Sequence, residues 1–331
     1  MTDERIRVAI NGFGRIGRTL MRLILSEARD FDLVLVNDIA APDLLAYLFA
    51  YDSVFGPWPE TVSAGDGALL VGGRAIPLHQ AEDLRALDLS GVDVLLECTG
   101  LAKTRGVAEA GLDAGARRVL ISGPSPAADA TLVLGANEDL LAGQPIVSNA
   151  SCTTNALAPL LRLMDAAWGV ESGQMTTVHC YTGSQPTVDK PRGTPERSRA
   201  AALSMVPTTT SAGALIGDVL PGLSGRVEAR ALRVPTASVS AIDLTVRLRE
   251  RPEAVEINAR LRAAAEASPV FGWIEAPLVS TDLRGRPESI VMSGPETSVA
   301  GELVRVFGWY DNEWGFSCRM LDMARLMAAE G

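Results

Sequence analysis

The sequence predicts an α/β protein with a parallel sheet in its first half and an α+β domain with a mostly antiparallel sheet in its second half. Three observations carry this prediction. Short apolar strands alternate with helical segments up to about residue 150. A glycine-rich turn, GFGRIG at 12–17, joins the first strand to the first helix. After residue 152 the strands become longer, β-branched and partly alternating, which is typical of antiparallel sheets.

In the first half, each strand-like run leads into a helix or into another strand. Strands are expected at 7–13, 31–38, 92–100, 117–123 and 130–137. Helical spacing of apolar residues is found at 15–28, 42–51 and 103–115. The strands are nearly continuous runs of Val, Ile and Leu, so they predict a parallel sheet that helices cover on both faces.

In the second half, strands are expected at 176–181, 226–235 and 238–249. The stretch between the first two, 182–199, is rich in Pro, Gly, Arg and Ser. It is too long for a routine connection, so we expect it to be a functional loop. The chain ends in an amphipathic helix, WGFSCRMLDMARLMA.

The composition excludes several classes of function. A net charge of −10 over 331 residues argues against a nucleic-acid surface. No apolar stretch approaches the roughly 18 residues of a membrane helix, and the N-terminus, MTDERIRVAI, has no signal-peptide core, so we expect a cytoplasmic protein. No CxxC spacing is present, so neither a disulfide framework nor a metal site is expected. The four cysteines are Cys98, Cys152, Cys180 and Cys318.

The glycine-rich turn has the context of a dinucleotide-binding loop. Gly12 would allow the tight turn, Gly14 the approach of a pyrophosphate, and Gly17 close packing of helix on strand. The second strand ends in Asp38, where a carboxylate would bind ribose hydroxyls and repel a 2′-phosphate. Alternatively, the glycines only turn the chain and Asp38 caps the strand. We interpret the motif as a Rossmann-type site for NAD rather than NADP.

Cys152 lies in the stretch SNASCTTNALAP, where a helix is expected to begin. The first turn of a helix offers unpaired N–H groups and a positive dipole, which favour a thiolate. Asn149 or Ser151 is the expected cap. Buried structural cysteines usually have apolar neighbours, whereas Cys152 is surrounded by hydroxyl and amide side chains. The local pattern leaves two alternatives, a nucleophile and a core cysteine.

His179 lies within the expected strand TTVHCY, and a lone histidine in a strand is commonly structural. The chain has one other histidine, His79, in the surface-like stretch PLHQAED. If Cys152 needs an imidazole partner, we therefore expect it to be His179. Strand alternation turns the adjacent Cys180 to the opposite face, where we expect it in the core.

These stretches together resemble the glyceraldehyde-3-phosphate dehydrogenase family along the whole chain. The resemblance rests on INGFGRIGR (10–18), VND (36–38), YDSVFG (51–56), ECTG (97–100), SNASCTTN (148–155), TVHCYTGSQ (177–185), RSRAAA (197–202), PTTT (207–210), RVPT (233–236) and WYDNEWGF (309–316). It implies an NAD-binding domain at 1–151, with the helix 315–331 packed back onto it. It also implies a catalytic domain at 152–314, with the family's S-loop at about 182–206.

The resemblance implies a reaction as well as a fold. Cys152 would attack the aldehyde of glyceraldehyde 3-phosphate, and His179 would act as the base during oxidation of the hemithioacetal by NAD. Inorganic phosphate would then attack the resulting thioester to give 1,3-bisphosphoglycerate. The Cys152 N–H and His179 are suitable donors for the hemithioacetal oxygen.

Binding residues follow from the same resemblance. It assigns the substrate phosphate to Thr182, Arg197 and Arg233, and the attacking phosphate to Ser151, Thr153, Arg197, Thr210 and Ser211. It assigns NAD binding to Gly12, Phe13, Gly14, Arg15, Ile16, Asp38, Thr99, Gly100, Ser122, Pro191 and Asn312. Taken alone, each arginine is also typical of a solvated or ion-paired surface. The S-loop implies a homotetramer, because in the family it packs against a neighbouring subunit's cofactor site.

The sequence departs from the family's usual residues mainly near the anion sites. Ser184 stands where Asp or Thr is common, and Ser211 where glycine is common. Erythrose 4-phosphate as the aldehyde, or arsenate as the oxyanion, is therefore an alternative with the same chemistry. A semialdehyde dehydrogenase and a non-catalytic, NAD-binding redox sensor that uses Cys152 are the remaining alternatives.

Overall fold

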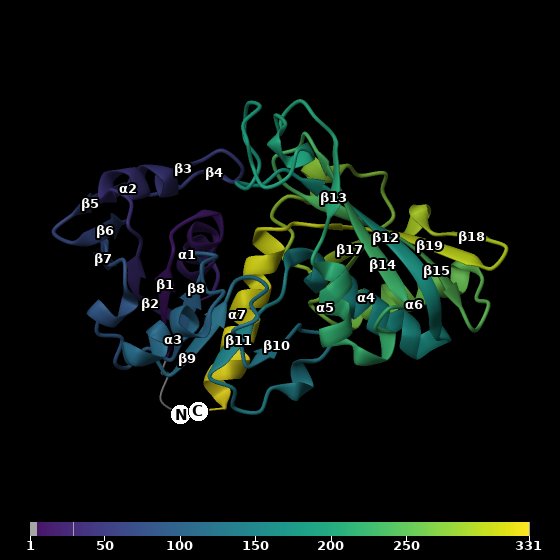
Figure 1. The fold of residues 1–331 in the computed structure, drawn as a ribbon, viewed down its shortest axis with the longest axis horizontal. Helices are drawn as coiled ribbons and strands as arrows, with labels where there is room; N and C mark the ends of the chain where they lie inside the picture. The colour runs from purple at the N-terminus through teal and green to yellow at the C-terminus, as the bar shows by residue number, and fades with distance from the viewer. Residues whose placement is uncertain (1–4, 29, 331) are drawn as a thin grey trace. The chain divides into compact units, whose positions relative to one another are not determined.

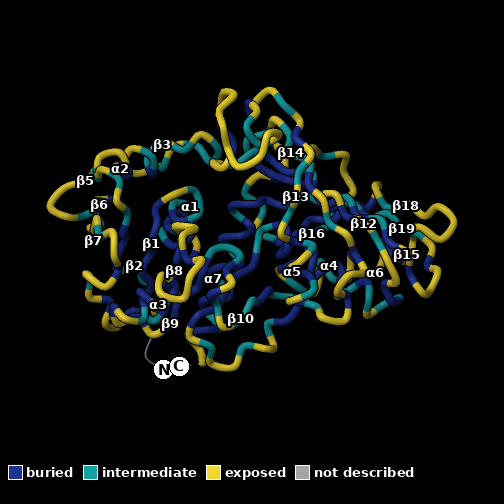
Figure 2. The backbone as a smooth tube through the Cα atoms, in the orientation of Figure 1, coloured by how far each residue is buried: buried dark blue, intermediate teal, exposed yellow. Residues whose placement is uncertain are grey.

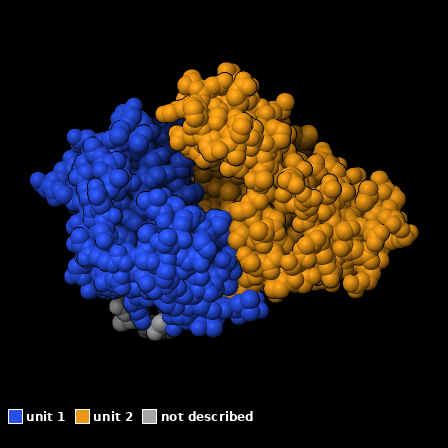
Figure 3. Space-filling view, viewed as in Figure 1, with its two compact units in different colours: residues 1–132, 139–150, 317–331 blue, residues 133–138, 151–316 orange. Residues whose placement is uncertain are grey.

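The computed structural model of the chain describes residues 5–28 and 30–330 (Figure 1). The expected domain start at residues 1–4 and the last residue of the expected terminal helix, Gly331, lie outside these residues. Strands are largely buried and the connecting loops largely exposed (Figure 2). The chain separates into two compact units (Figure 3). Unit 1 contains residues 1–132, 139–150 and 317–331, and unit 2 contains residues 133–138 and 151–316.

Unit 1 is built on one sheet, which is mostly parallel. From one edge to the other its strands are β10 (Ala130–Thr131), β11 (Ile146–Ser148), β9 (Arg118–Ile121), β8 (Val94–Glu97), β1 (Ile6–Asn11), β2 (Phe31–Asn37), β7 (Arg74–His79), β6 (Ala68–Val71) and β5 (Val62–Gly65). Neighbours from β10 to β7 are parallel, and β6 is antiparallel to both β7 and β5. All residues of β8 and β9 are buried, as their continuous apolar runs predict.

The helices predicted in the first half are confirmed. They are α1 (Arg15–Ser26), α2 (Pro42–Ala50) and α3 (Arg105–Asp113), and a small hairpin of β3 (Tyr51–Asp52) and β4 (Gly56–Pro57) follows α2. The last helix, α7 (Trp314–Ala329), contributes its residues from Ser317 onward to unit 1. There Arg325 forms an ion pair with Asp30 at 2.6 Å and lies over the ring of Phe31.

The strand predicted at 130–137 is wrong beyond its first two residues. Only Ala130–Thr131 pair with β11. The chain then turns, because the Asn137 side chain accepts a hydrogen bond from the Val133 N–H at 2.8 Å and Gly135 has a φ of +83°. The apolar residues that suggested a strand are buried within this turn instead.

The glycine-rich turn has the geometry that the sequence predicts. Gly12 has a φ of +90°, which is accessible to glycine at little cost. A Cβ on Gly17 would lie 2.2 Å from the Gly12 carbonyl oxygen, so α1 crosses β1 too closely for any side chain there. The helix can therefore pack closely on the strand only because position 17 has no side chain.

Replacing Gly17 with alanine is expected to lower the free energy of unfolding by about 2–3 kcal/mol, because the backbone must move to admit the methyl group. Urea denaturation of the two proteins measures the difference. Gly106→Ala in α3 is the matched control, since no atom lies within 4 Å of the added Cβ, and it should change stability by less than about 1 kcal/mol. Equal stability of the two variants would contradict the crowding at Gly17.

Unit 2 is built on a second, mostly antiparallel sheet. Its strands are, in order, β13 (Val206–Thr209), β14 (Val227–Val234), β12 (Val170–Cys180), β15 (Ser240–Leu248), β19 (Leu303–Tyr310), β17 (Ile290–Ser293) and β16 (Phe271–Ile274), and β18 (Ser298–Ala300) also pairs with β19. The predicted, mostly antiparallel sheet is confirmed, and two of its strand pairs are parallel. β12 is parallel to β14, and β16 is parallel to β17.

The helices of unit 2 are α4 (Cys152–Trp168), α5 (Ala212–Val219), α6 (Ala254–Ala267) and the first residues of α7. Ser151 is the N-cap of α4, and its hydroxyl oxygen accepts the Thr154 N–H at 3.1 Å. Four residues of α4 anchor it in the core, as the apolar spacing predicts. They are Ala156, Leu157, Leu160 and Leu161, each with no exposed surface.

Candidate active site

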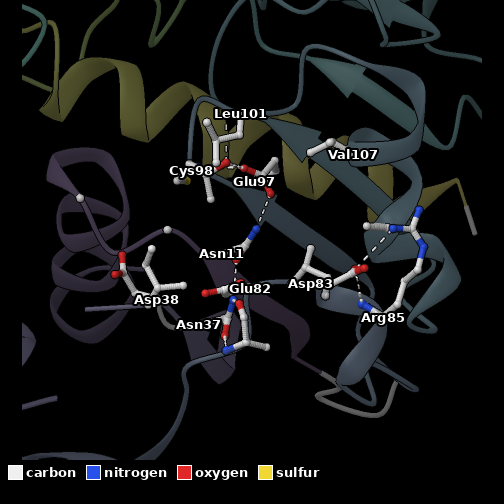
Figure 4. A pocket seen from close by; sticks show the side chains of 17 residues that line it. Asn11, Asn37, Asp38, Glu82, Asp83, Arg85, Glu97, Cys98, Leu101 and Val107 are labelled. Atoms are coloured by element: carbon white, nitrogen blue, oxygen red, sulfur yellow. Dashed lines mark hydrogen bonds and ion pairs between the residues drawn. The ribbon is translucent and has the colours of Figure 1, made fainter. Parts of the chain in front are cut away.

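Unit 1 contains a pocket of about 630 Å³ at the carboxyl ends of its central parallel strands (Figure 4). In open parallel sheets, ligands bind at this edge. The lining residues are Asn11, Gly12, Gly14, Asn37, Asp38, Ile39, Ala81, Glu82, Asp83, Leu84, Arg85, Glu97, Cys98, Thr99, Leu101, Val107 and Ala110. The sequence prediction of a dinucleotide site includes Gly12, Gly14, Asp38 and Thr99 of this set.

The glycine-rich turn fits a pyrophosphate. Gly14 is the exposed N-cap of α1, and no atom lies within 4 Å of the position where its Cβ would stand. This open space adjoins the first turn of α1, and the N–H groups at a helix N-terminus bind anions. The residues present therefore fit the phosphates of a dinucleotide.

Asp38 is held in place by backbone groups. One carboxylate oxygen accepts the Phe13 N–H at 2.7 Å, and the other accepts the Ala40 N–H at 2.9 Å. These bonds connect the end of β2 to the glycine-rich turn. The carboxylate also lines the pocket, so it is placed to accept hydrogen bonds from ribose hydroxyls.

The other predicted cofactor residues lie in varied surroundings. Phe13 is 1% exposed and stacks on Phe49, and its N–H and carbonyl oxygen are bonded to Asp38 and Arg18. Arg15 and Ile16 begin α1 and are partly buried, and Gly100 and Ser122 follow β8 and β9. Pro191 and Asn312 belong to unit 2, where Pro191 is exposed and Asn312 is buried.

Sequence reasoning missed much of the pocket wall. Asn11, Asn37 and Glu97 are the last residues of β1, β2 and β8, so a polar residue at the end of an apolar strand was the available signal. The segment 81–85 gave no such signal, because it follows β7, a strand that the pattern did not predict.

Cys152 and His179 are brought together within unit 2. Cys152 is the first residue of α4, and His179 is the penultimate residue of β12. The Cys152 Sγ lies 3.7 Å from the His179 Nε2. His179 is 5% exposed, whereas Cys152 remains partly accessible. The pair therefore has the geometry of a nucleophile with an adjacent base.

The hydrogen bond on the far side of the ring determines the state of His179. Its Nδ1 lies 2.7 Å from the Cys180 carbonyl oxygen, which can only accept a hydrogen bond. The Arg233 Nη1, which is a donor, also lies 3.2 Å from this Nδ1. Because the carbonyl contact is the shorter of the two, we assign the proton of the neutral ring to Nδ1, which leaves the lone pair of Nε2 facing Cys152. Arg233 donates to the same carbonyl at 3.0 Å, so it helps to hold the oxygen in place.

Burial opposes the expected effect of the helix N-terminus on Cys152. Desolvation raises the pKa of the Cys152 thiol to about 11, and the nearby Cys180 adds to the rise. The positive charge of Arg233 and hydrogen bonds from Thr153 lower this pKa only in part. His179 Nε2, which lies beside the sulfur, is the group to which the thiol proton can pass.

Alkylation of Cys152 by iodoacetamide is therefore expected to accelerate with pH throughout the alkaline range. A raised pKa means that the thiolate fraction grows with pH until about 11, by about tenfold per pH unit well below that value. Mass spectrometry of the peptide that contains Cys152 measures the rate. A rate that reaches a plateau near pH 7 would instead show a thiolate formed at neutral pH.

The predicted anion-binding residues form two hydrogen-bonded groups in unit 2. In the first, Arg233 lies 3.4 Å from the Thr182 hydroxyl, which in turn is 2.9 Å from the Ser184 hydroxyl. In the second, Arg197 donates to the Thr208 hydroxyl at 2.8 Å and to the Thr209 carbonyl at 3.1 Å.

The two arginines are close enough for their charges to interact. Arg197 contributes to the lowered pKa of Arg233, although desolvation is the larger cause. An anion near both guanidinium groups would relieve this repulsion. Thr210 and Ser211 follow Thr209 directly, and Ser211 is the N-cap of α5.

Tyr310 is a buried neighbour of the nucleophile that the sequence did not reveal. Its hydroxyl bonds to Thr153 at 3.0 Å and to Thr177 at 2.8 Å, and its ring packs edge-on to His179. Thr153 is 3% exposed, so its hydroxyl is directed to Tyr310 in this arrangement. Burial raises the pKa of Tyr310, which keeps its hydroxyl neutral.

No cluster of three or more His, Cys, Asp or Glu side chains in residues 5–28 and 30–330 could hold a metal ion. Among the described helices, none combines the length and apolar character needed to cross a membrane.

Comparison with known proteins gives matches along the chain. The family model for the glyceraldehyde 3-phosphate dehydrogenase NAD binding domain matches residues 6–105, and the model for the C-terminal domain of the same enzyme matches residues 151–312. A glyceraldehyde-3-phosphate dehydrogenase of Cereibacter sphaeroides is 45% identical, over 97% of this chain and 98% of the relative. Glyceraldehyde-3-phosphate dehydrogenases of Pseudomonas aeruginosa and Bacillus subtilis are 44% and 40% identical, each over 98% of this chain and over 98% and 97% of the relatives.

Proposed function

Because the chain belongs to the glyceraldehyde-3-phosphate dehydrogenase family and is an NAD-dependent oxidoreductase, we propose that it oxidises glyceraldehyde 3-phosphate to 1,3-bisphosphoglycerate with inorganic phosphate. The observation that carries this proposal is the approach of Cys152 Sγ to His179 Nε2 at 3.7 Å. The names of the relatives give no support to a semialdehyde dehydrogenase or to a redox sensor.

The first step is attack of the Cys152 sulfur on the aldehyde carbon, while His179 Nε2 takes the thiol proton. His179 then passes this proton to the former aldehyde oxygen, which gives a hemithioacetal hydroxyl and returns the imidazole to its neutral form. His179 and the Cys152 N–H can stabilise the charge that develops on this oxygen by hydrogen bonds. When bound, NAD supplies the acceptor for the hydride that leaves the hemithioacetal carbon. His179 takes the hydroxyl proton in this step, and a thioester remains on Cys152. Phosphate then attacks the thioester, and the Cys152 sulfur leaves.

Residues of unit 1 would hold the dinucleotide. The N-terminus of α1 at Gly14 would take the pyrophosphate, and the Asp38 carboxylate the ribose hydroxyls. Thr99, which lines the same pocket, is placed to bind as well. The roles that the family resemblance implies for the remaining cofactor residues, including Asn312 and Pro191, are part of this proposal.

The anion-binding residues would divide two phosphates between them. We propose that Arg233 and Thr182 bind the phosphate of the substrate, and that Ser151, Thr153, Thr210 and Ser211 bind the attacking phosphate. The Ser151 hydroxyl could donate to it while still capping α4, and the Thr153 hydroxyl would exchange its bond to Tyr310. Arg197 would serve both, and its electrostatic interaction with Arg233 supports a shared anion region. Guanidinium and hydroxyl donors suit a tetrahedral oxyanion, and arsenate has the same shape.

Initial rates of NADH formation test the proposal. Each aldehyde, glyceraldehyde 3-phosphate and erythrose 4-phosphate, is assayed with no oxyanion, with phosphate and with arsenate. We expect the highest kcat/KM with glyceraldehyde 3-phosphate and a strict need for an oxyanion. A rate that is independent of the oxyanion would refute the phosphorylating reaction, and a preference for erythrose 4-phosphate would change the substrate.

We also infer a homotetramer in the cytoplasm. The loop 182–206 exposes apolar side chains, with Val188 at 69%, Leu203 at 85% and Met205 at 70%, as expected of a loop that packs against a neighbouring subunit. Light scattering coupled to size-exclusion chromatography should give four times the chain mass of 34.9 kDa. A monomer mass would exclude this assembly.

A further inference from the structure

Three polar side chains form a buried row beneath the pocket of unit 1. Asn11, Asn37 and Glu97 are the last residues of β1, β2 and β8, and Asn11 pairs in register with both of the others. Their exposed fractions are 8% for Asn11, 3% for Asn37 and 2% for Glu97. Burying a carboxylate is costly unless donors surround it, so this row requires an explanation.

Both oxygens of the Glu97 carboxylate accept hydrogen bonds. Its Oε1 accepts both the N–H of Thr99, at 2.9 Å, and the Thr99 hydroxyl proton. Its Oε2 accepts a proton of the Asn11 amide at 2.5 Å. A carboxylate can only accept hydrogen bonds, so it fixes which end of the Asn11 amide faces it.

This direction continues along the row, as Figure 4 shows. The Asn11 Oδ1 is left to face Asn37 and accepts the Asn37 Nδ2 at 2.8 Å. The Asn37 amide is thereby oriented too. It donates to the Ala81 carbonyl at 3.0 Å and accepts the Ala81 N–H at 2.9 Å. Ala81 begins the segment 81–85, which forms one wall of the pocket.

We propose that Glu97 is a positioning residue for the adenosine half of NAD. One carboxylate oxygen orients the Asn11 amide and, through it, the Asn37 amide, which holds the pocket wall at 81–85 in place. The other oxygen holds Thr99 in the loop that follows β8. We specify the adenosine half because Asp38 directly follows Asn37 and lines the same pocket, and its carboxylate would bind the ribose hydroxyls of that half. The inference rests on the proposed use of NAD.

Neutralising the carboxylate without changing its shape is the direct test. In Glu97→Gln, the new amide cannot accept from Thr99 and from Asn11 together, because one of its ends is now a donor. Either Thr99 is released or the Asn11 and Asn37 amides must turn over and lose Ala81. Isothermal titration calorimetry should show NAD and ADP-ribose, which lacks the nicotinamide, both binding at least about tenfold more weakly than to wild type.

A second substitution should restore the row. In the double variant E97Q/N11D, the amide introduced at position 97 would donate to a carboxylate at position 11, which would accept from Asn37 as before. Each donor in the row then faces an acceptor again, and the negative charge lies at position 11 instead of position 97. We expect the double variant to bind both ligands within about threefold of wild type, which is a strong positive coupling in the double-mutant cycle. Glu109→Gln on α3, which only loses an ion pair with Arg105, is the matched control.

Each outcome has a distinct meaning. If Glu97→Gln lowers the melting temperature but binds NAD and ADP-ribose as wild type does, Glu97 is only structural and the inference is overturned. It is also overturned if the losses in E97Q/N11D add. If Glu97→Gln does not fold, the double variant still decides, because restored folding with wild-type affinity supports the row and weak binding refutes it. A wild-type protein that binds no NAD would overturn the proposed function and this inference together.

Discussion

Replacing Cys152 with serine is expected to lower kcat/KM for the aldehyde by at least about 10⁴-fold, because a hydroxyl at this position is a far weaker nucleophile than the thiol. The proposed thioester also requires sulfur, so the serine variant should accumulate no acyl-enzyme. Stopped-flow measurement of the first turnover, combined with intact-protein mass spectrometry after acid quench, tests both statements. The side chain of Ser151, which caps α4, is unchanged, so the fold around position 152 should be retained.

Cys318→Ser is the matched control, since Cys318 is a free cysteine of unit 1. It should keep wild-type kinetics. If Cys152→Ser kept full dehydrogenase activity, the assignment of the nucleophile would be wrong. If both variants lost activity equally, the loss would reflect a general effect on the protein rather than the chemistry of Cys152.

Replacing His179 with glutamine is expected to lower kcat by about 10³-fold at neutral pH, because no base then faces the thiol proton. The loss should shrink as the pH rises. The Cys152 pKa is raised to about 11, so an increasing fraction of thiol ionises without help as the pH approaches that value. Profiles of kcat against pH from about 6.5 to about 10 for the two proteins measure this convergence.

His79→Gln is the control for this experiment, because His79 is the chain's other histidine and lies exposed at the end of β7. Its profile should coincide with that of wild type. A His179→Gln deficit that stays constant with pH would show that the loss does not come from ionisation of the thiol, and would place the role of the imidazole in the later hydride step.

Local patterns predicted those parts of the fold in which the residue types and their spacing indicate the same structure. The continuous apolar runs of β8 and β9 identified strands buried on both faces, and the glycines at 12–17 identified the turn between β1 and α1. The strand expected at 130–137 failed because a side-chain hydrogen bond to Asn137 closes a turn. Such a bond leaves no periodic signal. The parallel pairing of β12 with β14 depends on tertiary contacts, which the apolar pattern of a single strand does not encode.

The candidate site likewise has features that the sequence predicted and features that it did not. Residue type and scarcity made Cys152 and His179 candidates, and the family resemblance implied their roles. The structure brings their side chains together. The state of the thiol was not predictable, because helix position alone favours a thiolate, whereas the raised pKa depends on packing that is known only in three dimensions. Glu97 was likewise invisible as a functional residue. Its proposed role depends on hydrogen bonds with segments up to 86 residues away in the sequence.

The division of α7 between the units has a consequence for the newly made chain. Residues from Ser317 onward complete unit 1, where Arg325 pairs with Asp30 and Glu330 accepts the Gly143 N–H at 2.6 Å. In chain order, α7 comes after nearly all of unit 2, so unit 1 lacks its closing helix until unit 2 has been synthesised. The folding of unit 1 is therefore coupled to the synthesis of its neighbour.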